Sequence, residues 1–158
     1  MDHDAVYLTP EGKAQAEQEL DDLINVKRLA LAERLHFAIK QGDLSENADY
    51  QAAKEEQAFL EGRILHLQQV LRVAKVIDTD SANEDGRIKL GSVITVIEEG
   101  YDDPETYYLV GRTEADPSKG RISHASPLGK ALLGHIAGDK VSIAAPAGRM
   151  TFTIVKIA

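Results

Sequence analysis

The sequence predicts an α+β protein: an N-terminal antiparallel two-helix coiled-coil hairpin, then a small antiparallel β-sheet domain that carries one short helix. Three observations support this prediction. Apolar residues recur at steps of three and four between residues 50 and 74, a glycine interrupts the helical pattern at residue 42, and the apolar period becomes alternating after residue 86. We therefore expect the hairpin domain at residues 1–78, a linker at residues 79–86 and the sheet domain at residues 87–158.

The first helix is predicted to begin at Pro10. Thr9 suits the N-cap position, and proline is favoured directly after it because its missing N–H has no helical partner there. Residues that favour helix continue to Gln41, and Gly42 then ends the pattern. This segment carries a rough apolar stripe, formed by Leu20, Ile24, Leu31, Leu35 and Ala38.

The second helix has the more regular pattern. Its seam runs over more than three heptads with one polar member, and it consists of Tyr50, Ala53, Gln57, Leu60, Ile64, Leu67, Leu71 and Ala74. A short break between two amphipathic helices makes them antiparallel neighbours. Roughly 30 residues at about 1.5 Å per residue give an arm on the order of 45 Å long. Because two helices bury only one narrow seam, such an arm needs a second module or a partner.

The second module is predicted from its strand formers. Alternating residues at 92–97, the run "TYYLVG" and the run "RMTFTIVKI" read as strands, and Met150, Phe152 and Ile154 share one face of the last one. Between these strands, Ser126 and Pro127 predict the start of a short helix.

Composition excludes several classes of protein. The net charge of −8 disfavours autonomous binding to duplex DNA, and the absence of cysteine excludes disulfides, thiolate zinc sites and cysteine nucleophiles. The five histidines show no ligand spacing, and neither a G-x-S-x-G motif nor a phosphate loop occurs. No run of about 18 apolar residues is present, so we expect a cytoplasmic protein that does not enter a membrane.

Two acids, Asp43 and Glu46, lie at the predicted turn of the hairpin, and they have two interpretations. Asp43 suits the N-cap of the second helix, with Glu46 closing a capping box three residues later. Alternatively, the two carboxylates converge on Mg²⁺, which is commonly held by one or two carboxylates while other ligands complete its shell. Such a site is incomplete alone, so it would donate ligands to the active site of another protein.

The chain also resembles a known family. The stretch "GDLSENADY" at 42–50, continued by "QAAKEEQAFLEGRI" at 51–64, is similar to the signature of the bacterial Gre transcript-cleavage factors of the GreA type. The likeness extends over essentially the whole chain, to "LTPEGKAQAEQEL" at 8–20 and "ISHASPLGKALLGHIAGDKVSIAAPAG" at 122–148.

This resemblance implies a fold and an activity. The C-terminal domain would resemble the FK506-binding-protein fold and bind RNA polymerase, while the coiled coil enters the polymerase's secondary channel. The factor would not be an enzyme itself. It would stimulate the polymerase's own Mg²⁺-dependent cleavage of the nascent RNA near its 3′ end in backtracked complexes, so that elongation resumes.

By motif position, the resemblance assigns roles to four residues. Asp43 and Glu46 would share the catalytic Mg²⁺ with the polymerase and position the attacking water, although the free protein, a monomer, would hold no metal stably. Asn47 and Tyr50 would support the tip. Apart from the motif, two basic residues of the hairpin, Lys40 and Lys54, are candidates for contact with RNA or polymerase.

The chain departs from the family pattern at two positions of the tip. Ile39 stands where members often have arginine, and Ser45 stands where many have lysine. The change at Ile39 predicts weak contact with the extruded RNA. Two other functions stay open: a Gre-like regulator that blocks the secondary channel without promoting cleavage, and a peptidyl-prolyl isomerase, which the low aromatic content of 5% disfavours.

Overall fold

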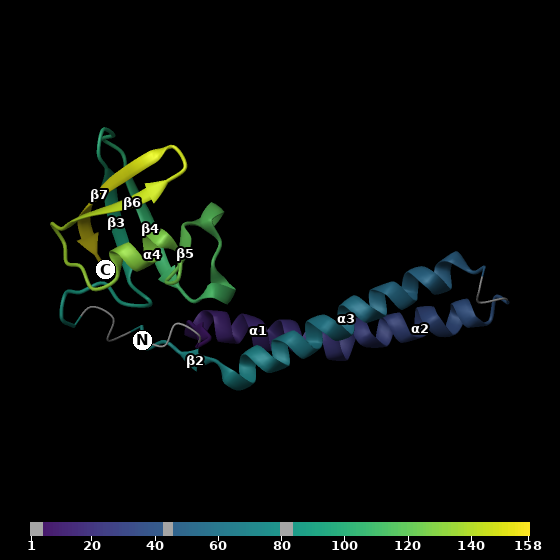
Figure 1. Ribbon diagram of the computed structural model, residues 1–158. Helices are drawn as coiled ribbons and strands as arrows, with labels where there is room; N and C mark the ends of the chain where they lie inside the picture. The colour runs from purple at the N-terminus through teal and green to yellow at the C-terminus, as the bar shows by residue number, and fades with distance from the viewer. Residues whose placement is uncertain (1–4, 43–45, 80–83) are drawn as a thin grey trace. The chain divides into compact units, whose positions relative to one another are not determined.

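The structure is a computed structural model, and it describes residues 5–42, 46–79 and 84–158. The chain forms two compact units, one made of Met1–Gly12 and Ala74–Ala158, the other of Lys13–Val73 (Figure 1). The units differ from the predicted ranges, because residues on both sides of the hairpin group with the sheet. Strand β1 (Tyr7–Leu8) pairs in parallel with β2 (Lys75–Val76), which brings these distant segments together.

The predicted helical hairpin is confirmed. Its first arm consists of α1 (Pro10–Asp22), a π-helical turn at Leu23–Lys27 and α2 (Arg28–Ile39), and its second arm is α3 (Ala48–Val73). Thr9 caps α1 as predicted, since its Oγ1 accepts a hydrogen bond from the N–H of Gly12 at 3.0 Å. No helix in the described ranges has the length and apolar character needed to cross a membrane.

The predicted seam packs between the two arms. Every heptad position from Tyr50 to Ala74 is buried or half-buried, and Leu31 and Ala38 are buried on the facing arm. Leu23 is also buried, although the predicted stripe does not include it. The π-helical turn explains this difference, because a turn with an extra residue shifts the side of the helix that faces the seam.

Three arginine–glutamate pairs link the arms. Arg63 binds Glu19 through two hydrogen bonds of 2.7 and 2.9 Å, Arg28 binds Glu61 through two of 2.9 and 2.8 Å, and Arg34 binds Glu56 at 2.5 Å. The hydrogen bond from Arg63 lowers the pKa of the Glu19 carboxyl below its usual value. These pairs mark the register of the two helices, and because they are exposed to solvent they add little stability.

The sheet unit has five strands in the order β5-β4-β3-β7-β6. They are β3 (Val93–Glu98), β4 (Pro104–Val110), β5 (Arg121–Ser123), β6 (Lys140–Ala145) and β7 (Gly148–Ile157). The prediction of a purely antiparallel sheet is wrong at one edge, where β4 and β5 are parallel. The chain reaches β5 through 3₁₀ turns at Arg112–Glu114 and Pro117–Lys119, so it returns in the same direction as β4.

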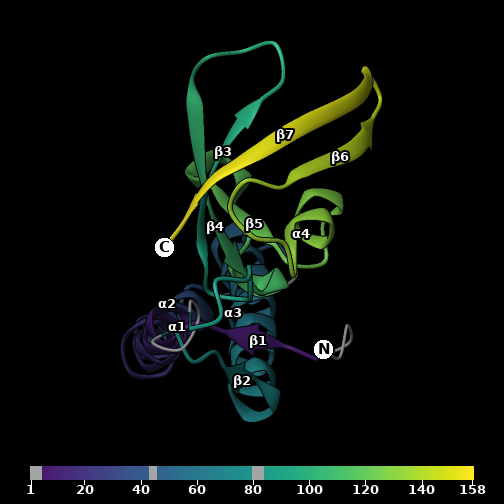
Figure 2. The same ribbon diagram turned by 90° about the vertical axis from the view of Figure 1, so that its left-hand side faces the viewer.

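One face of this sheet carries the core. The side chains of Ile94, Val96, Leu109, Phe152 and Ile154 are at most 2% exposed. Helix α4 (Pro127–Leu132) contacts β6, as Figure 2 also shows, and contributes Leu132 to this core. As predicted, Ser126 caps α4, because its Oγ accepts a hydrogen bond from Gly129 at 3.1 Å.

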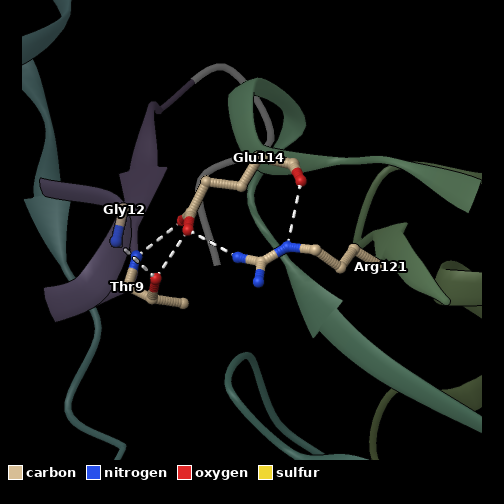
Figure 3. A network of polar contacts seen from close by, with 4 residues as sticks. All are labelled: Thr9, Gly12, Glu114 and Arg121. Atoms are coloured by element: carbon tan, nitrogen blue, oxygen red, sulfur yellow. Dashed lines mark hydrogen bonds and ion pairs between the residues drawn. The ribbon is translucent and has the colours of Figure 1, made fainter. Parts of the chain in front are cut away.

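A buried polar network ties the start of α1 to the sheet unit (Figure 3). The carboxylate of Glu114 accepts hydrogen bonds from the N–H of Thr9 at 2.7 Å and from its hydroxyl at 2.5 Å. Arg121 donates to the same carboxylate at 2.9 Å. Thr9 is fully buried and the side chain of Glu114 is 8% exposed, so the carboxylate needs these partners to offset its desolvation.

Candidate functional site

The candidate site is the turn between α2 and α3, where the sequence places its pair of acids. Of the six predicted site residues, the structure describes five; Asp43 lies outside the described residues. Glu46 is exposed two residues before the first residue of α3. Its carboxylate is therefore available to a partner at this end of the hairpin.

Asn47 organises the turn. Its Oδ1 accepts a hydrogen bond from the backbone N–H of Tyr50 at 3.1 Å, which is the geometry of an N-cap bonded to the third helical residue. Its Nδ2 donates to the carbonyl oxygen of Ala38 in α2 at 2.8 Å. One half-buried amide therefore caps the second arm and bonds to the last turn of the first.

The capping-box interpretation fails at Glu46, while its other member, Asp43, lies outside the described residues. Because α3 begins at Ala48, its N-cap is Asn47, and Glu46 precedes the helix instead of standing at its third position. Asn47 is better suited to the cap here because an amide has both an acceptor for Tyr50 and a donor for Ala38, whereas a carboxylate has only acceptors. Glu46 is left free of the capping role that the sequence suggested.

The two hydrogen bonds of Asn47, to Tyr50 and to Ala38, are called the Asn47 clamp. The other predicted residues lie on the same hairpin. Tyr50 is half-buried in the first turn of α3. Lys40 is exposed directly after α2, and Lys54 is exposed on α3, where its ammonium group donates to Gln57 at 3.0 Å. The two lysines thus lie on different arms of the hairpin, and both are accessible from solvent.

The carboxylate of Glu46 suits a hard cation such as Mg²⁺, which prefers oxygen ligands and keeps several other positions for water or phosphate. Within the described ranges, no three residues of His, Cys, Asp or Glu gather as a metal-binding group. Glu46 alone supplies fewer ligands than a bound Mg²⁺ requires.

Comparison with known proteins decides the family. The family model described as "Transcription elongation factor, N-terminal" matches residues 6–76, and the model described as "Transcription elongation factor, GreA/GreB, C-term" matches residues 83–158. The chain belongs to the GreA/GreB family of transcription elongation factors. The resemblance seen in the sequence is confirmed, and the two matched regions together cover nearly all of this GreA-type factor.

Two GreA relatives agree with this assignment. The chain is 48% identical to a transcription elongation factor GreA of Listeria welshimeri over 150 residues, which covers 95% of this chain and 93% of the relative. It is 47% identical to a GreA of Acetivibrio thermocellus over 152 residues, covering 96% and 95%. Among solved structures, it is similar to GreA factor homolog 1 of Thermus thermophilus, with 30% identity, a TM-score of 0.44 and coverage of 98% and 99%.

Proposed function

We propose that this elongation factor stimulates the RNA-cleaving activity of RNA polymerase. The sheet unit binds the polymerase, and the hairpin enters its secondary channel and reaches the 3′ end of a backtracked nascent RNA. The observation that carries the proposal is the exposed carboxylate of Glu46, which adjoins the Asn47 clamp at the turn of a family-typical hairpin. The factor acts as a monomer in the cytoplasm and does not cleave RNA without the polymerase.

The residues of the tip have distinct parts in this mechanism. Glu46, with Asp43, would hold Mg²⁺ together with carboxylates of the polymerase. When bound, this ion would supply Lewis-acid activation of the attacking water and stabilise the charge of the phosphodiester during hydrolysis. Asn47 holds the end of α2 against the start of α3, which limits the positions that the neighbouring Glu46 can take. Lys40 and Lys54 contact RNA or polymerase electrostatically.

The test is cleavage in a stalled, backtracked elongation complex. Purified wild-type protein should release a short RNA fragment bearing the 3′ end well above the rate of polymerase alone. Replacing Asp43 and Glu46 together with alanine should abolish this stimulation and leave polymerase binding largely unchanged, whereas Glu55→Ala, an exposed acid elsewhere on α3, should behave as wild type.

Two results would contradict the proposal. A wild-type protein that binds polymerase and slows elongation without releasing a fragment would indicate a channel-blocking regulator. A double variant that no longer binds polymerase would indicate that the acids serve the structure of the tip.

A further inference from the structure

Two of the three phenylalanines in the chain are exposed on the hairpin. Phe152 is 2% exposed in the sheet core, but Phe37 on α2 is 66% exposed and Phe59 on α3 is 80% exposed. Covering a phenylalanine side chain removes a large apolar area from water and is therefore favourable. Scattered single apolar residues need no explanation, but aromatic residues that share one hollowed face indicate a binding surface.

The two rings do share one face. Phe59 lines a hollow of about 320 Å³ together with Leu31 and Leu60, and Phe37 lines a hollow of about 490 Å³. Ala30 and Arg34 line both hollows, so the hollows adjoin along the contact of α2 and α3. We call this surface the phenylalanine groove.

The spacing of the hollows fits a helix. The pairs Arg28–Glu61 and Arg34–Glu56 set the register of the arms, which places Phe59 level with Ala30. Phe37 lies about seven residues nearer the turn, which is about 10 Å along the hairpin axis. Side chains at positions i and i+7 of an α-helix are separated by the same distance, so two apolar residues on one side of a partner helix match the two hollows.

The charges around Phe37 indicate what accompanies these apolar residues. Glu33 and Asp49 line the same hollow as the ring, and neither forms an ion pair with any described residue. Arg34, the only cationic group lining this hollow, is bound to Glu56 at 2.5 Å. Two carboxylates beside an aromatic face favour an arginine or lysine side chain and repel the phosphates of RNA.

We propose that the phenylalanine groove receives an amphipathic helix of a protein partner. Two apolar side chains of that helix, two turns apart, enter the hollows of Phe59 and Phe37, and an adjacent arginine or lysine binds Glu33 and Asp49. The inference rests on the proposed function, in which the partner helix belongs to the wall of the polymerase channel that surrounds the hairpin.

Crosslinking tests the kind of partner. A photoreactive benzoylphenylalanine replaces Phe37 or Phe59 in the full-length factor, which is then bound to a backtracked elongation complex and irradiated. We expect both positions to crosslink to a helical segment of a polymerase subunit, with a basic residue near the crosslink from position 37. Crosslinks to RNA, crosslinks to a second copy of the factor, or no crosslinks at either position would each overturn the inference.

Substitution tests the contribution of the groove. The double variant Phe37→Ala/Phe59→Ala should raise the factor concentration that gives half-maximal cleavage by about tenfold or more, because buried aromatic anchors dominate interfaces. Glu33→Arg should raise it as well. Leu65→Ala, at an equally exposed position of α3 outside both hollows, and Glu55→Arg are the matched controls and should leave it unchanged.

The outcomes separate this inference from the proposed function. If the wild type fails to stimulate cleavage, the proposed function fails. If the wild type stimulates cleavage and the double variant requires the same concentration, only the groove inference fails. Alanine favours helix at both exposed positions, and circular dichroism of each variant verifies that the hairpin is intact.

Discussion

The side-chain amide of Asn47 donates to the carbonyl oxygen of Ala38 at 2.8 Å and so joins the end of one hairpin arm to the start of the other. A helix leaves its last carbonyl groups and its first N–H groups without helical partners. Asn47 bonds to one group of each kind, since its Oδ1 also accepts from Tyr50, and the Ala38 carbonyl accepts a further hydrogen bond from the N–H of Gln41 at 3.2 Å. Both the oxygen and the nitrogen of the Asn47 side-chain amide are therefore hydrogen-bonded, and Asn47 directly follows the exposed Glu46.

Substitutions at Asn47 distinguish its two hydrogen bonds: the one from the Tyr50 N–H, which caps α3, and the one to the Ala38 carbonyl, which joins the two arms. Asn47→Ala should destabilise the protein by about 1–2 kcal/mol, because it removes an N-cap worth about 1 kcal/mol and the hydrogen bond to the Ala38 carbonyl, which keeps its bond from the N–H of Gln41 at 3.2 Å. Asn47→Ser keeps a cap acceptor but does not reach Ala38, so we expect a smaller loss of stability and a clear loss of cleavage stimulation. Urea denaturation followed by circular dichroism measures the first effect, and the backtracked-complex assay measures the second.

Asn25→Ala is the control for this series. Asn25 is exposed on the first arm of the hairpin, and within the described residues its side chain bonds only to Asp21, at 2.7 Å. Its replacement should change stability by less than about 0.5 kcal/mol and leave stimulation unchanged. Equal effects of Asn47→Ser and Asn25→Ala on stimulation would show that the bridge to Ala38 does not matter for the tip.

Two glycines in the helices should respond oppositely to alanine. A Cβ atom at the buried Gly12 would overlap the carboxylate of Glu114, which is held by Thr9 and Arg121. Gly12→Ala should therefore destabilise the protein by about 1–3 kcal/mol in spite of alanine's higher helix propensity. At Gly62 in α3 no atom lies within 4 Å of the added Cβ, so Gly62→Ala should stabilise the protein by about 0.5–1 kcal/mol. Thermal unfolding of both variants tests the pair, and a stabilising Gly12→Ala would contradict the tight approach of Glu114.

Glu114 itself should be sensitive to substitution. Glu114→Ala removes the acceptor for both groups of Thr9 and leaves the guanidinium of Arg121 without its carboxylate. Because these are charge-assisted and largely buried bonds, we expect a loss of about 2–3 kcal/mol. Hydrogen exchange should show faster exchange at the N–H of Gly12 and in β1. Unchanged protection there would mean that the network does not hold the start of α1.

The hairpin was accessible to prediction because its information is local. A heptad from Tyr50 to Ala74 identifies a buried seam whatever lies against it, and Thr9 and Ser126 cap their helices through bonds to residues three positions away. The cap of α3 could not be predicted, because Asp43, Ser45 and Asn47 are all residue types that are favoured at the N-cap. Only the carbonyl of Ala38, supplied by the other arm, favours the amide.

Features that depend on residues far apart in the sequence could not be predicted, because sequence patterns carry local information. The bond from Thr9 to Glu114 spans 105 residues, and nothing near either residue signals the other. The parallel pairing of β4 with β5 depends on 3₁₀ turns whose sequence reads only as loop. Phe37 and Phe59 lie outside both predicted apolar stripes, which agrees with their exposure, but the hollows beside them depend on side chains from both arms of the hairpin.

Acid should weaken the hairpin partly through Glu19. Its folded-state pKa lies below the usual value of 4.5, chiefly because Arg63 donates hydrogen bonds to its carboxylate. A depressed pKa means that the ion pair contributes stability above about pH 4.5, and that this contribution is lost as the pH falls through the lower folded-state value. The side chains are exposed by 48% and 42%, so solvent limits the contribution to about 0.5 kcal/mol. Glu19→Gln should therefore lower the free energy of unfolding at pH 7 and flatten its pH dependence between about pH 5 and 3, as measured by urea titrations at successive pH values.

Glu55→Gln, which removes an exposed carboxylate with no ion pair in the described chain, should follow the wild-type profile. If Glu19→Gln kept the full acid sensitivity of the wild type, other carboxylates would have to carry it.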